Sequence, residues 1–183
     1  MDEYVDILDE HGNYTGEVVL KSEAHLKGLF HPTVHVWFYT VNNELLLQKR
    51  SVTKKTFPGL WDVSVAGHIG TGEDIFDSAK REVQEELGVN LENEELVKIG
   101  FHKSQQRHSE NLIDCEFHHI FISELKTSLK DLKLQESEVS DVKLISINDF
   151  EKVINTPPLS KDYVILDKAY YDTVLTAINK ELL

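Results

Sequence analysis

The sequence contains one cysteine among its 183 residues, Cys115, so the chain cannot close an internal disulfide bond. A disulfide framework is therefore excluded, and a single thiol is typical of a protein that works in a reducing compartment. Without a second thiol there is also no cysteine knuckle for a metal ion. We interpret Cys115 as a small apolar side chain of the core.

Long apolar segments and a basic leader are also missing. No run approaches the roughly eighteen apolar residues that cross a membrane, and the segment from Met1 to Tyr4 lacks the basic and apolar regions of a signal peptide. The sequence therefore predicts a cytoplasmic protein with no membrane partner. It leaves the oligomeric state open, a homodimer included.

Positive charge is scarce, because 19 lysines and arginines face 32 acidic residues and the formal net charge is −13. A nucleic-acid partner is disfavoured, since phosphate backbones bind to basic surfaces. An anionic small molecule can still bind where cations or a metal ion are gathered locally. We therefore expect a small-molecule diphosphate partner and no nucleic acid.

The residues that are present suffice for a folded core. With 40% apolar and 28% charged residues, the chain has the size of one domain, and no linker, repeat or low-complexity tract divides it. We predict a single domain over residues 1–183. An N-terminal hairpin and short helix are expected in 1–30 and a C-terminal helix in 160–183, with helical apolar spacing from Tyr163 onward.

Alternating and β-branched residues predict strands through much of the chain. The predicted strands are residues 33–41, 44–50, 61–66, 96–102, 111–122 and 139–147. A polar segment, 103–110, is expected to be a loop that lies over the functional site. Mixed strands flanked by two or three helices predict an α/β/α sandwich.

The segment 67–89 carries the strongest pattern. As a helix, residues 75–87 place five apolar side chains within an arc of about 120°, which predicts a core-facing stripe. Glu82, Glu85 and Glu86 then share one flank within about 100°. Like charges this close repel, by about 0.2–0.5 kcal/mol for each exposed pair and by more near the core. A hard divalent cation would relieve that repulsion.

The same segment reads Gly67, five residues, Glu73, seven residues, and then Arg81-Glu82-Val83-x-Glu85-Glu86-x-Gly88-Val89. It resembles a complete Nudix box, with every defined position filled. The resemblance implies the Nudix fold, an α/β/α sandwich with a mixed sheet and the signature in a loop–helix–loop. It also implies that Glu82, Glu85 and Glu86 bind Mg²⁺ or Mn²⁺. Arg81 and Glu73 would orient these ligands, and Glu73 is a further candidate ligand.

Carboxylate ligands without cysteine favour Mg²⁺ or Mn²⁺ over zinc, and these ions bridge a protein to phosphate oxygens. Hydrolysis of a diphosphate bond follows, because the ion offsets developing negative charge and activates a bound water. We predict that Glu82, Glu85 and Arg81 take part in catalysis. The general base is left open: Glu138 is a candidate outside the box, and the alternative is a solvated glutamate at the start of a strand.

A basic cluster precedes the box. Four cations lie within seven residues of an otherwise acidic chain, namely Lys49, Arg50, Lys54 and Lys55. We predict that Arg50, Lys54 and Lys55 bind the diphosphate. The alternative is the basic edge of a hairpin.

A wider run, from about His25 to Glu116, resembles a narrower branch, the type 1 isopentenyl-diphosphate isomerases, which share the Nudix fold. The matching pieces are Glu23-Ala24-His25 through His31, Lys54-Lys55-x-Phe57-Pro58-Gly59-Leu60-Trp61, Ala66-Gly67-His68 and Asp114-x-Glu116. The resemblance implies a second divalent metal, held by His25, His31, His68, Asp114 and Glu116. Hydrogen-bonded structural histidines are the alternative.

Two departures separate the chain from that branch. The isomerase's catalytic cysteine falls on Ala66, which has no proton to exchange, and the spacing from His25 to His31 is one residue shorter. True isomerases also lack part of the Nudix box. Four further histidines are interpreted as structural: His102, His108, His118 and His119.

We therefore predict a Nudix hydrolase of the isomerase-like branch. Its substrate would be a small X-linked diphosphate, in which X is a nucleoside or an isoprenyl group. Two alternatives stay open at this point. One is an isopentenyl-diphosphate isomerase-like protein, and the other is a non-catalytic regulator that binds diphosphate ligands on the same fold.

Overall fold

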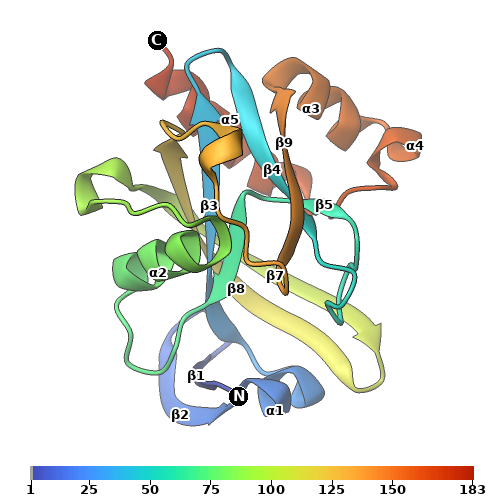
Figure 1. Ribbon diagram of the computed structural model, residues 1–183. Coiled ribbons are helices and arrows are strands. Elements are labelled where there is room, and N and C mark those ends of the chain that lie inside the picture. Colours follow the sequence, from blue (N-terminus) through green and yellow to red (C-terminus); the bar gives the residue numbers. More distant parts are fainter. Residues whose placement is uncertain (1) are drawn as a thin grey trace.

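The computed structural model describes residues 2–183. Strand β3 (His31–Thr40) lies at its centre, and all residues of β3 but the last are buried. β8 (Leu112–Glu124) runs parallel to β3, whereas β4 (Glu44–Arg50) and β6 (Val65–His68) pair antiparallel with opposite ends of it. The two antiparallel partners diverge, so the sheet splays open between β4 and β6 (Figure 1).

The hydroxyl of Ser64 fills the wedge where β4 and β6 separate. It accepts a hydrogen bond of 2.8 Å from the backbone N–H of Phe38 and donates one of 2.5 Å to the carbonyl of Leu46. Backbone groups that the splayed strands would leave unpaired are satisfied in this way. The opening between the strands is therefore stabilised by Ser64, and it leaves room for a cavity on the side of β6.

Three further strands complete the sheet. β7 (Val97–Ser109) pairs antiparallel with β8, and both β5 (Trp61–Asp62) and β9 (Val139–Ser146) pair antiparallel with β4. The strand order is β5-β4-β3-β8-β7, with β6 also beside β3 and β9 also beside β4. One parallel pair among antiparallel pairs makes the sheet mixed, as predicted.

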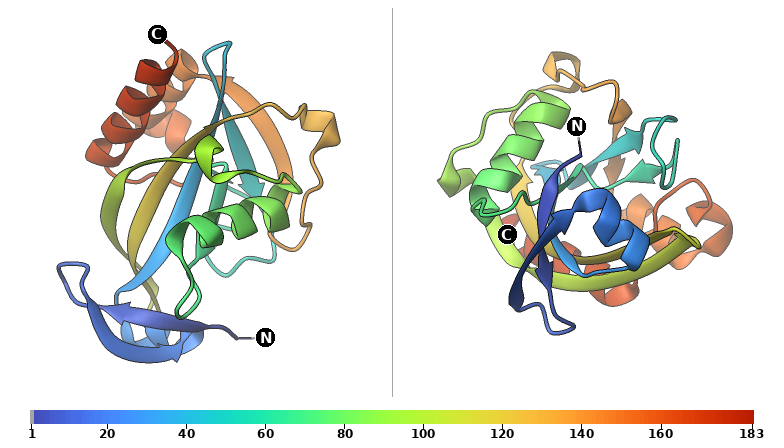
Figure 2. Two further views of the ribbon diagram at one scale, coloured as in Figure 1. Left: turned by 90° about the vertical axis from the view of Figure 1, so that its left-hand side faces the viewer. Right: turned by 90° about the horizontal axis from the view of Figure 1, so that it is seen from below.

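Helices cover both faces of this sheet (Figures 1 and 2). On one face, α2 (Ile75–Leu87) packs an apolar stripe that includes Val83 against Val34 and Phe121. On the other, α5 (Lys168–Glu181) and α3 (Ile147–Asn155) enclose a core built around Trp37 and Tyr170. The arrangement is the predicted α/β/α sandwich. In the described part of the chain, no helix has the length and apolar character that crossing a membrane requires.

An N-terminal unit packs at one end of the sheet, below it in the view of Figure 1. β1 (Tyr4–Leu8) and β2 (Tyr14–Leu20) form an antiparallel hairpin with a small apolar core, and α1 (Lys21–Lys27) follows directly. Gly28 ends α1 in the left-handed conformation, with φ of 64°. This turn brings His25 of α1 against the start of β3. Three short helical turns lie elsewhere: η1 (Asn93–Glu95), η2 (Leu129–Asp131) and α4 (Pro157–Ser160).

The predicted loop over residues 103–110 is wrong. Most of these residues continue β7, which forms a long antiparallel ladder with β8. Their side chains alternate between exposed and half-buried, because β7 is an edge strand whose neighbours are solvent and polar groups. An edge strand of this kind needs no apolar alternation, so its sequence resembles that of a loop.

The C-terminal helix is shorter than its apolar spacing predicts. Tyr163 forms a parallel bridge with Trp61, and the N–H of Val164 donates to the carbonyl of Trp61 at 2.8 Å. Asp167 then starts α5 by accepting a hydrogen bond of 3.0 Å from the N–H of Tyr170. The first residues of the apolar pattern thus belong to an extended segment beside β5, and the helix begins only after that segment.

Candidate functional site

The glutamate-bearing helix α2 has the boundaries that the sequence predicts. Asp74 caps its first turn by accepting two backbone N–H groups, and Gly88 ends it with a left-handed φ of 69°. Gly67 of β6 lies against the middle of the helix, where an added Cβ would be 1.9 Å from Cδ of Glu82. Only glycine at this position lets the Glu82 carboxylate lie against β6.

Arg81 gathers the acidic residues of α2. Its guanidinium donates to both carboxylate oxygens of Glu73, at 2.8 and 2.9 Å. Nη1 also donates to Glu82 at 2.7 Å and to Glu85 at 3.3 Å, and the second of these is the contact that the helix spacing predicts. Nη2 is fixed to β6 through the carbonyl of His68 at 3.0 Å. Because both oxygens of Glu73 are occupied, the geometry supports its orienting role over a role as metal ligand.

Glu86 is enclosed, with 3% of its surface exposed. One of its oxygens accepts a hydrogen bond of 3.1 Å from Nε2 of Gln48 on β4. Burial raises the pKa of Glu86 well above its usual range, and the charge of Glu82 raises it further. Burial also raises the pKa of Glu82, against the opposing charge of Arg81. Two neighbouring carboxylates that resist ionisation would be stabilised in their charged form by a cation.

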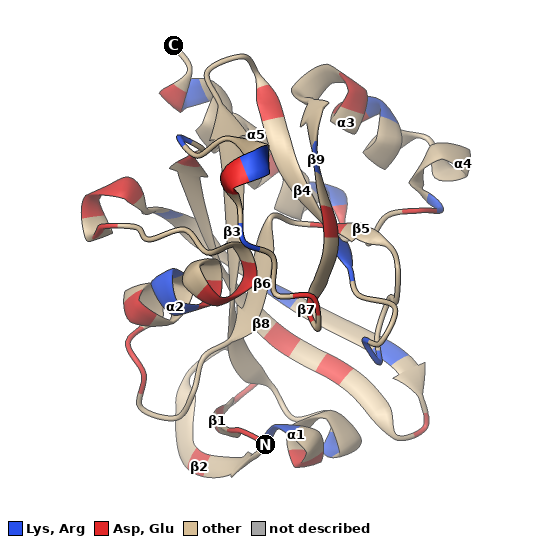
Figure 3. Cartoon of the chain, viewed as in Figure 1, with Lys and Arg blue, Asp and Glu red and all other residues tan. Residues whose placement is uncertain are grey.

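A cavity of about 1210 Å³ opens beside this helix. It is bordered by α1, by β3, β6 and β8, and by the loop 51–60 between β4 and β5. Acidic residues lie on α2 and β8, and basic ones near the loop after β4 (Figure 3). Glu82 and Glu85 line the cavity together with Arg50 and Glu138, so α2 shares this space with the predicted diphosphate-binding residues.

Three histidines and a glutamate converge at the wall of the same cavity, which His25, His68 and Glu116 line. Ligand atoms of His25, His31, His68 and Glu116 all lie within 4.8 Å of one another. Nε2 of His31 and Nε2 of His68 each lie 3.6 Å from the same oxygen of Glu116. The His31 ring is oriented by Nδ1–H, which donates to the carbonyl of Leu29 at 2.9 Å. Its Nε2 lone pair therefore faces the cluster, as in a metal-binding imidazole.

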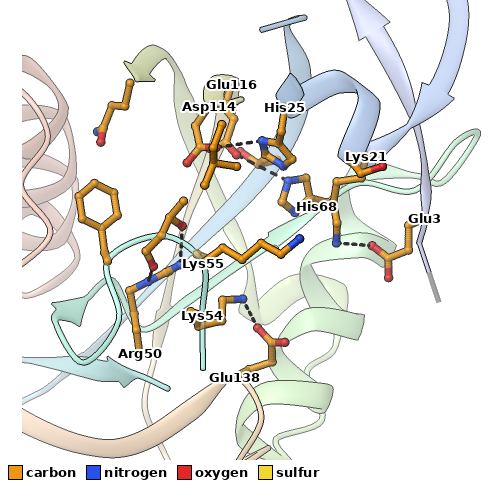
Figure 4. A pocket seen from close by; sticks show the side chains of 18 of the residues that line it. Glu3, Lys21, His25, Arg50, Lys54, Lys55, His68, Asp114, Glu116 and Glu138 are labelled. Carbon is orange, nitrogen blue, oxygen red and sulfur yellow. Dashed lines mark hydrogen bonds and ion pairs between the residues drawn. The ribbon is translucent and has the colours of Figure 1, made fainter. Parts of the chain in front are cut away.

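Asp114 stands beside this cluster (Figure 4). Its Oδ2 lies 2.8 Å from Nε2 of His108. Its Oδ1 lies 2.9 Å from Nδ1 of His25, but neither atom has a hydrogen-bond partner. Within residues 2–183, Nδ1 of His25 and the Nε2 atoms of His31 and His68 are buried without a hydrogen-bond partner. Unpaired buried nitrogens are costly, and one bound metal ion would pair with all three.

The charges of the cluster favour an ionised carboxylate. Burial opposes the charged form of Glu116, but the neighbouring His31, His118 and His68 hold its pKa well below the usual range. Burial lowers the pKa of His68 well below its usual value. For His31, burial works toward a lower pKa, but Glu116 outweighs it and raises the pKa. The set thus combines a carboxylate with imidazole lone pairs, which is a metal-binding combination.

The three basic residues predicted to bind substrate differ in their contacts. Arg50 is anchored in the cavity wall, because Nη1 donates to Asp62 at 3.0 Å and the other guanidinium groups donate to Thr56. Lys54 pairs with Glu138 (Figure 4). Lys55 is exposed at the cavity, and among residues 2–183 no side chain or carbonyl holds its ammonium group. Lys55 is therefore ready to meet an anion directly.

Residues 29–165 match the model of the NUDIX domain, which is well over half of the chain. The chain belongs to the Nudix family. A protein of Clostridium acetobutylicum named as a Nudix hydrolase is 38% identical over 157 residues, which are 84% of this chain and 75% of that protein. An isopentenyl-diphosphate Delta-isomerase 2 of Photorhabdus laumondii is 32% identical over 158 residues, 86% of this chain and 85% of that one. Relatives with both names agree with the predicted branch.

Solved structures of Nudix type share the fold. A Deinococcus radiodurans protein superposes with a TM-score of 0.67 over 92% of this chain and 96% of its own, at 17% identity. A bifunctional NMN adenylyltransferase/ADP ribose pyrophosphatase of Francisella tularensis, in complex with AMP and a manganese ion, gives a TM-score of 0.54 over 83% of this chain and 42% of its own, at 20% identity. At these identities the likeness concerns the fold alone.

The Nudix glutamates do not converge on one point as the histidines do. Within residues 2–183, the group of His25, His31, His68 and Glu116 is the one set of three or more ligand residues whose atoms all lie within 4.8 Å. Arg81 draws Glu82 and Glu85 toward itself, while Glu86 bonds Gln48. The donor set of the Nudix helix still fits Mg²⁺ or Mn²⁺, because it consists of carboxylate oxygens, part of them buried and mutually repulsive.

Sequence reasoning missed a row of polar residues in the Nudix cavity. Thr33, His35 and His118 line it, although His118 was interpreted as structural and the other two were read only as strand residues. The structure pairs β3 and β8 in parallel, with His31 opposite Glu116 and Thr33 opposite His118. Residues two apart on a strand have their side chains on the same face. Thr33 and His35 therefore share a face with the predicted ligand His31, and His118 shares one with Glu116.

Proposed function

We propose that this Nudix protein hydrolyses the diphosphate bond of a small X-linked diphosphate, assisted by bound Mg²⁺ or Mn²⁺. The observation that carries the proposal is the Arg81-centred cluster, in which Glu82 and Glu85 line the same cavity as the histidine cluster and the basic residues. Carboxylates and imidazoles gathered this closely, with raised pKa values at Glu82 and Glu86, suit metal-assisted chemistry on a phosphate group.

Residues of two clusters would hold metal ions. The first set is Glu82, Glu85 and Glu86, and the second is His25, His31, His68 and Glu116, with Asp114 beside His25. A divalent ion bound there would offset the negative charge that develops on phosphate oxygens and lower the pKa of a water. Arg81 holds two of the carboxylates in place, and Lys55 supplies an uncommitted positive charge for the diphosphate.

Replacement of Arg50 with alanine is expected to raise KM by roughly tenfold or more, because a charge-assisted hydrogen bond contributes about 1.5–3 kcal/mol. Steady-state kinetics with a hydrolysed diphosphate measures this. Arg50→Lys should recover only part of the loss, since it keeps the charge but not the fork that grips Asp62 and Thr56. Arg107, exposed on β7 away from the cavity, provides the control Arg107→Ala. An unchanged KM in Arg50→Ala would remove Arg50 from substrate binding.

Glu138 remains our candidate for the general base. It lines the cavity and its carboxylate pairs with Lys54. If Glu138 takes a proton from water, Glu138→Gln lowers kcat and removes the acidic limb of the pH–rate profile, because the amide cannot accept that proton. Glu136→Gln, two residues away and outside the cavity, is the matched control. A profile with both limbs unaltered in Glu138→Gln would exclude Glu138 from this role.

A substrate screen tests the proposal as a whole. The purified protein is incubated with Mg²⁺ or Mn²⁺ and with nucleoside diphosphates and triphosphates, dinucleotides, sugar nucleotides and isopentenyl diphosphate, and released phosphate or phosphomonoester is measured. Metal-dependent release from one class supports the proposal. Binding of these compounds without any release would instead favour a non-catalytic regulator.

The histidine cluster favours one second candidate, an isopentenyl-diphosphate isomerase-like activity. His25, His31, His68 and Glu116 meet within 4.8 Å, as the resemblance to that branch implies. Ala66 weighs against it, because this residue lines the cavity with a methyl group and has no proton to exchange. We therefore place hydrolysis first.

A further inference from the structure

A chain of hydrogen bonds runs from the core to the cavity wall through α5. Nε1 of Trp37 donates to the phenol oxygen of Tyr170 at 2.8 Å, and that oxygen lies 2.7 Å from Nδ1 of His35. All three side chains are buried, with 2%, 1% and 8% exposed for Trp37, Tyr170 and His35. Trp37 and Tyr170 of this Trp37–Tyr170–His35 relay belong to the core on the α5 side of the sheet and not to the one that packs against α2, and the proposed hydrolysis makes no use of the relay.

The relay fixes the tautomer of His35. Trp37 Nε1–H can only donate, so it uses the phenol oxygen of Tyr170 as acceptor. The phenol hydrogen then needs an acceptor of its own, and Nδ1 of His35 is the partner within reach. The opposite assignment, with Nδ1–H donating, would leave that hydrogen unpaired in the core. The ring hydrogen of His35 therefore sits on Nε2. Burial lowers the pKa of His35 to about 4, which keeps the ring neutral.

The Nε2 atom of His35 faces the cavity. The ring lines the cavity, and no residue within 2–183 makes a hydrogen bond to Nε2. Nε2 is also absent from the buried unpaired atoms of the described chain, which include Nε2 of His31 and of His68. Solvent or a ligand can therefore reach it. Ala66, directly opposite His35 across the β3–β6 pair, has only a methyl group and leaves the approach open.

The surroundings of His35 are polar. The His118 ring stacks on His35 with centroids 4.0 Å apart, and Nδ1 of His118 shares a hydrogen bond of 2.8 Å with the hydroxyl of Thr33. Thr33 and His118 line the cavity beside His35. A hydrocarbon group placed here would cover Nε2–H of His35 without giving it an acceptor, and such a mismatch is strongly disfavoured. An oxygen atom of a ligand can accept the hydrogen bond from Nε2–H of His35.

We propose that His35, held in its Nε2–H form by Tyr170, is a specificity-determining hydrogen-bond donor to the organic group X of the substrate. The class of X is then one with hydroxyl or carbonyl oxygens near the diphosphate, such as a sugar, and not a hydrocarbon chain. His35 contacts the substrate, and Tyr170 is a positioning residue that acts through His35. The inference rests on the proposed diphosphate hydrolysis and names its substrate class.

The tautomer is tested without any substrate. Nitrogen-15 NMR of the histidine rings distinguishes a protonated from an unprotonated Nε2, and we expect Nε2–H at His35 in the wild type. Tyr170→Phe should move His35 to a mixture of tautomers, because its Nδ1 loses the phenol donor. Tyr171→Phe is the matched control, since the Tyr171 hydroxyl donates to Val164 and not to His35. An Nδ1–H ring in the wild type, or one unchanged by Tyr170→Phe, would overturn the relay.

The substrate class is tested with two probes, ADP-ribose and isopentenyl diphosphate, each with Mg²⁺. We expect the wild type to favour ADP-ribose in kcat/KM by at least about a hundredfold. His35→Phe should reduce that preference at least about tenfold, mainly through KM for ADP-ribose. His35→Gln should retain more of it, since its amide can donate into the cavity. A wild type that favours isopentenyl diphosphate, or an unchanged preference in His35→Phe, contradicts the inference.

Failure of the proposed hydrolysis is recognised separately. If the wild type hydrolyses neither probe, hydrolysis of these diphosphates is refuted, and calorimetric binding of the same two probes still tests His35. Tighter binding of ADP-ribose that weakens in His35→Phe but not in His119→Asn supports the subsite; His119 shares β8 but does not line the cavity. Equal binding by wild type and His35→Phe refutes the subsite, whether or not hydrolysis occurs.

Discussion

Replacement of Glu86 with glutamine is expected to lower kcat by at least about a hundredfold while the fold is retained. The carboxylate is 3% exposed and bonded to Gln48, so the amide fits the same space and keeps a hydrogen bond to that residue. What is lost is a charge that the proposed metal ion would need. Loss of turnover at saturating diphosphate, with unchanged circular dichroism, is the expected result. Wild-type turnover in Glu86→Gln would remove Glu86 from the metal site.

The same variant is expected to be at least as stable as the wild type without metal. Burial raises the pKa of Glu86 well above the reference value of 4.5, so the folded state favours the protonated form. The stability that this provides is complete below about pH 4.5 and is lost as the pH rises through the folded-state pKa. Thermal unfolding with chelator at pH 7 should therefore show an equal or higher Tm for Glu86→Gln.

Added Mg²⁺ distinguishes the effect of metal binding on Tm from the effect of removing the Glu86 charge. A ligand that binds only the folded state raises Tm in proportion to its affinity, so the wild type should gain more from Mg²⁺ than Glu86→Gln. Asp77→Asn is the matched control, because Asp77 is an exposed acidic residue of the same helix that pairs with Lys80. A lower Tm of Glu86→Gln in chelator, or an equal gain from Mg²⁺, would contradict the assignment.

Local signals explain why α2 was predicted to the residue. Asp74 and Gly88 mark its ends by their own capping chemistry, and the apolar stripe has a helical period. The hairpin of β7 and β8 had no such signal. Residues 103–110 are polar because they lie at a sheet edge between solvent and a polar cavity. A strand in that position lacks apolar alternation, so its sequence predicts a loop. The fold was thus predictable where burial of one face gives the apolar residues a regular spacing, and not where a strand borders a polar space.

The candidate site likewise contains residues that the sequence predicts and residues that only the structure shows. The glutamates of α2 and the histidine cluster were predicted from motif positions, and the structure brings His25, His31, His68 and Glu116 together from four elements. His35 was missed because its partner Tyr170 lies far along the chain and its neighbours on β3 are apolar. No sequence pattern reports a tautomer, which depends on which side chain reaches Nδ1. Residues that act through a long-range contact therefore need the structure.

Incubation with isopentenyl diphosphate is expected to give no detectable dimethylallyl diphosphate. Moving the double bond requires a proton donor on one face of the alkene and an acceptor on the other, both within hydrogen-bond reach of carbon. Ala66 lines the cavity and can serve as neither. Cys115 cannot replace the missing thiol, because it lies between Asp114 and Glu116 on β8, points to the opposite face and is fully buried.

Glu116 supplies at most half of the acid–base pair. It lies among His25, His31 and His68, so a metal held there would orient it on one side of the substrate alone. The reaction is followed in deuterated water with Mg²⁺, and both phosphate release and deuterium in the allylic product are measured. Enzyme-dependent deuterium incorporation by the wild type would overturn the hydrolase assignment, whereas phosphate release without deuterium would support it. Ala66→Cys places a thiol opposite His35, and deuterium entry in that variant alone would show that the proton donor is the one group this cavity lacks for isomerisation.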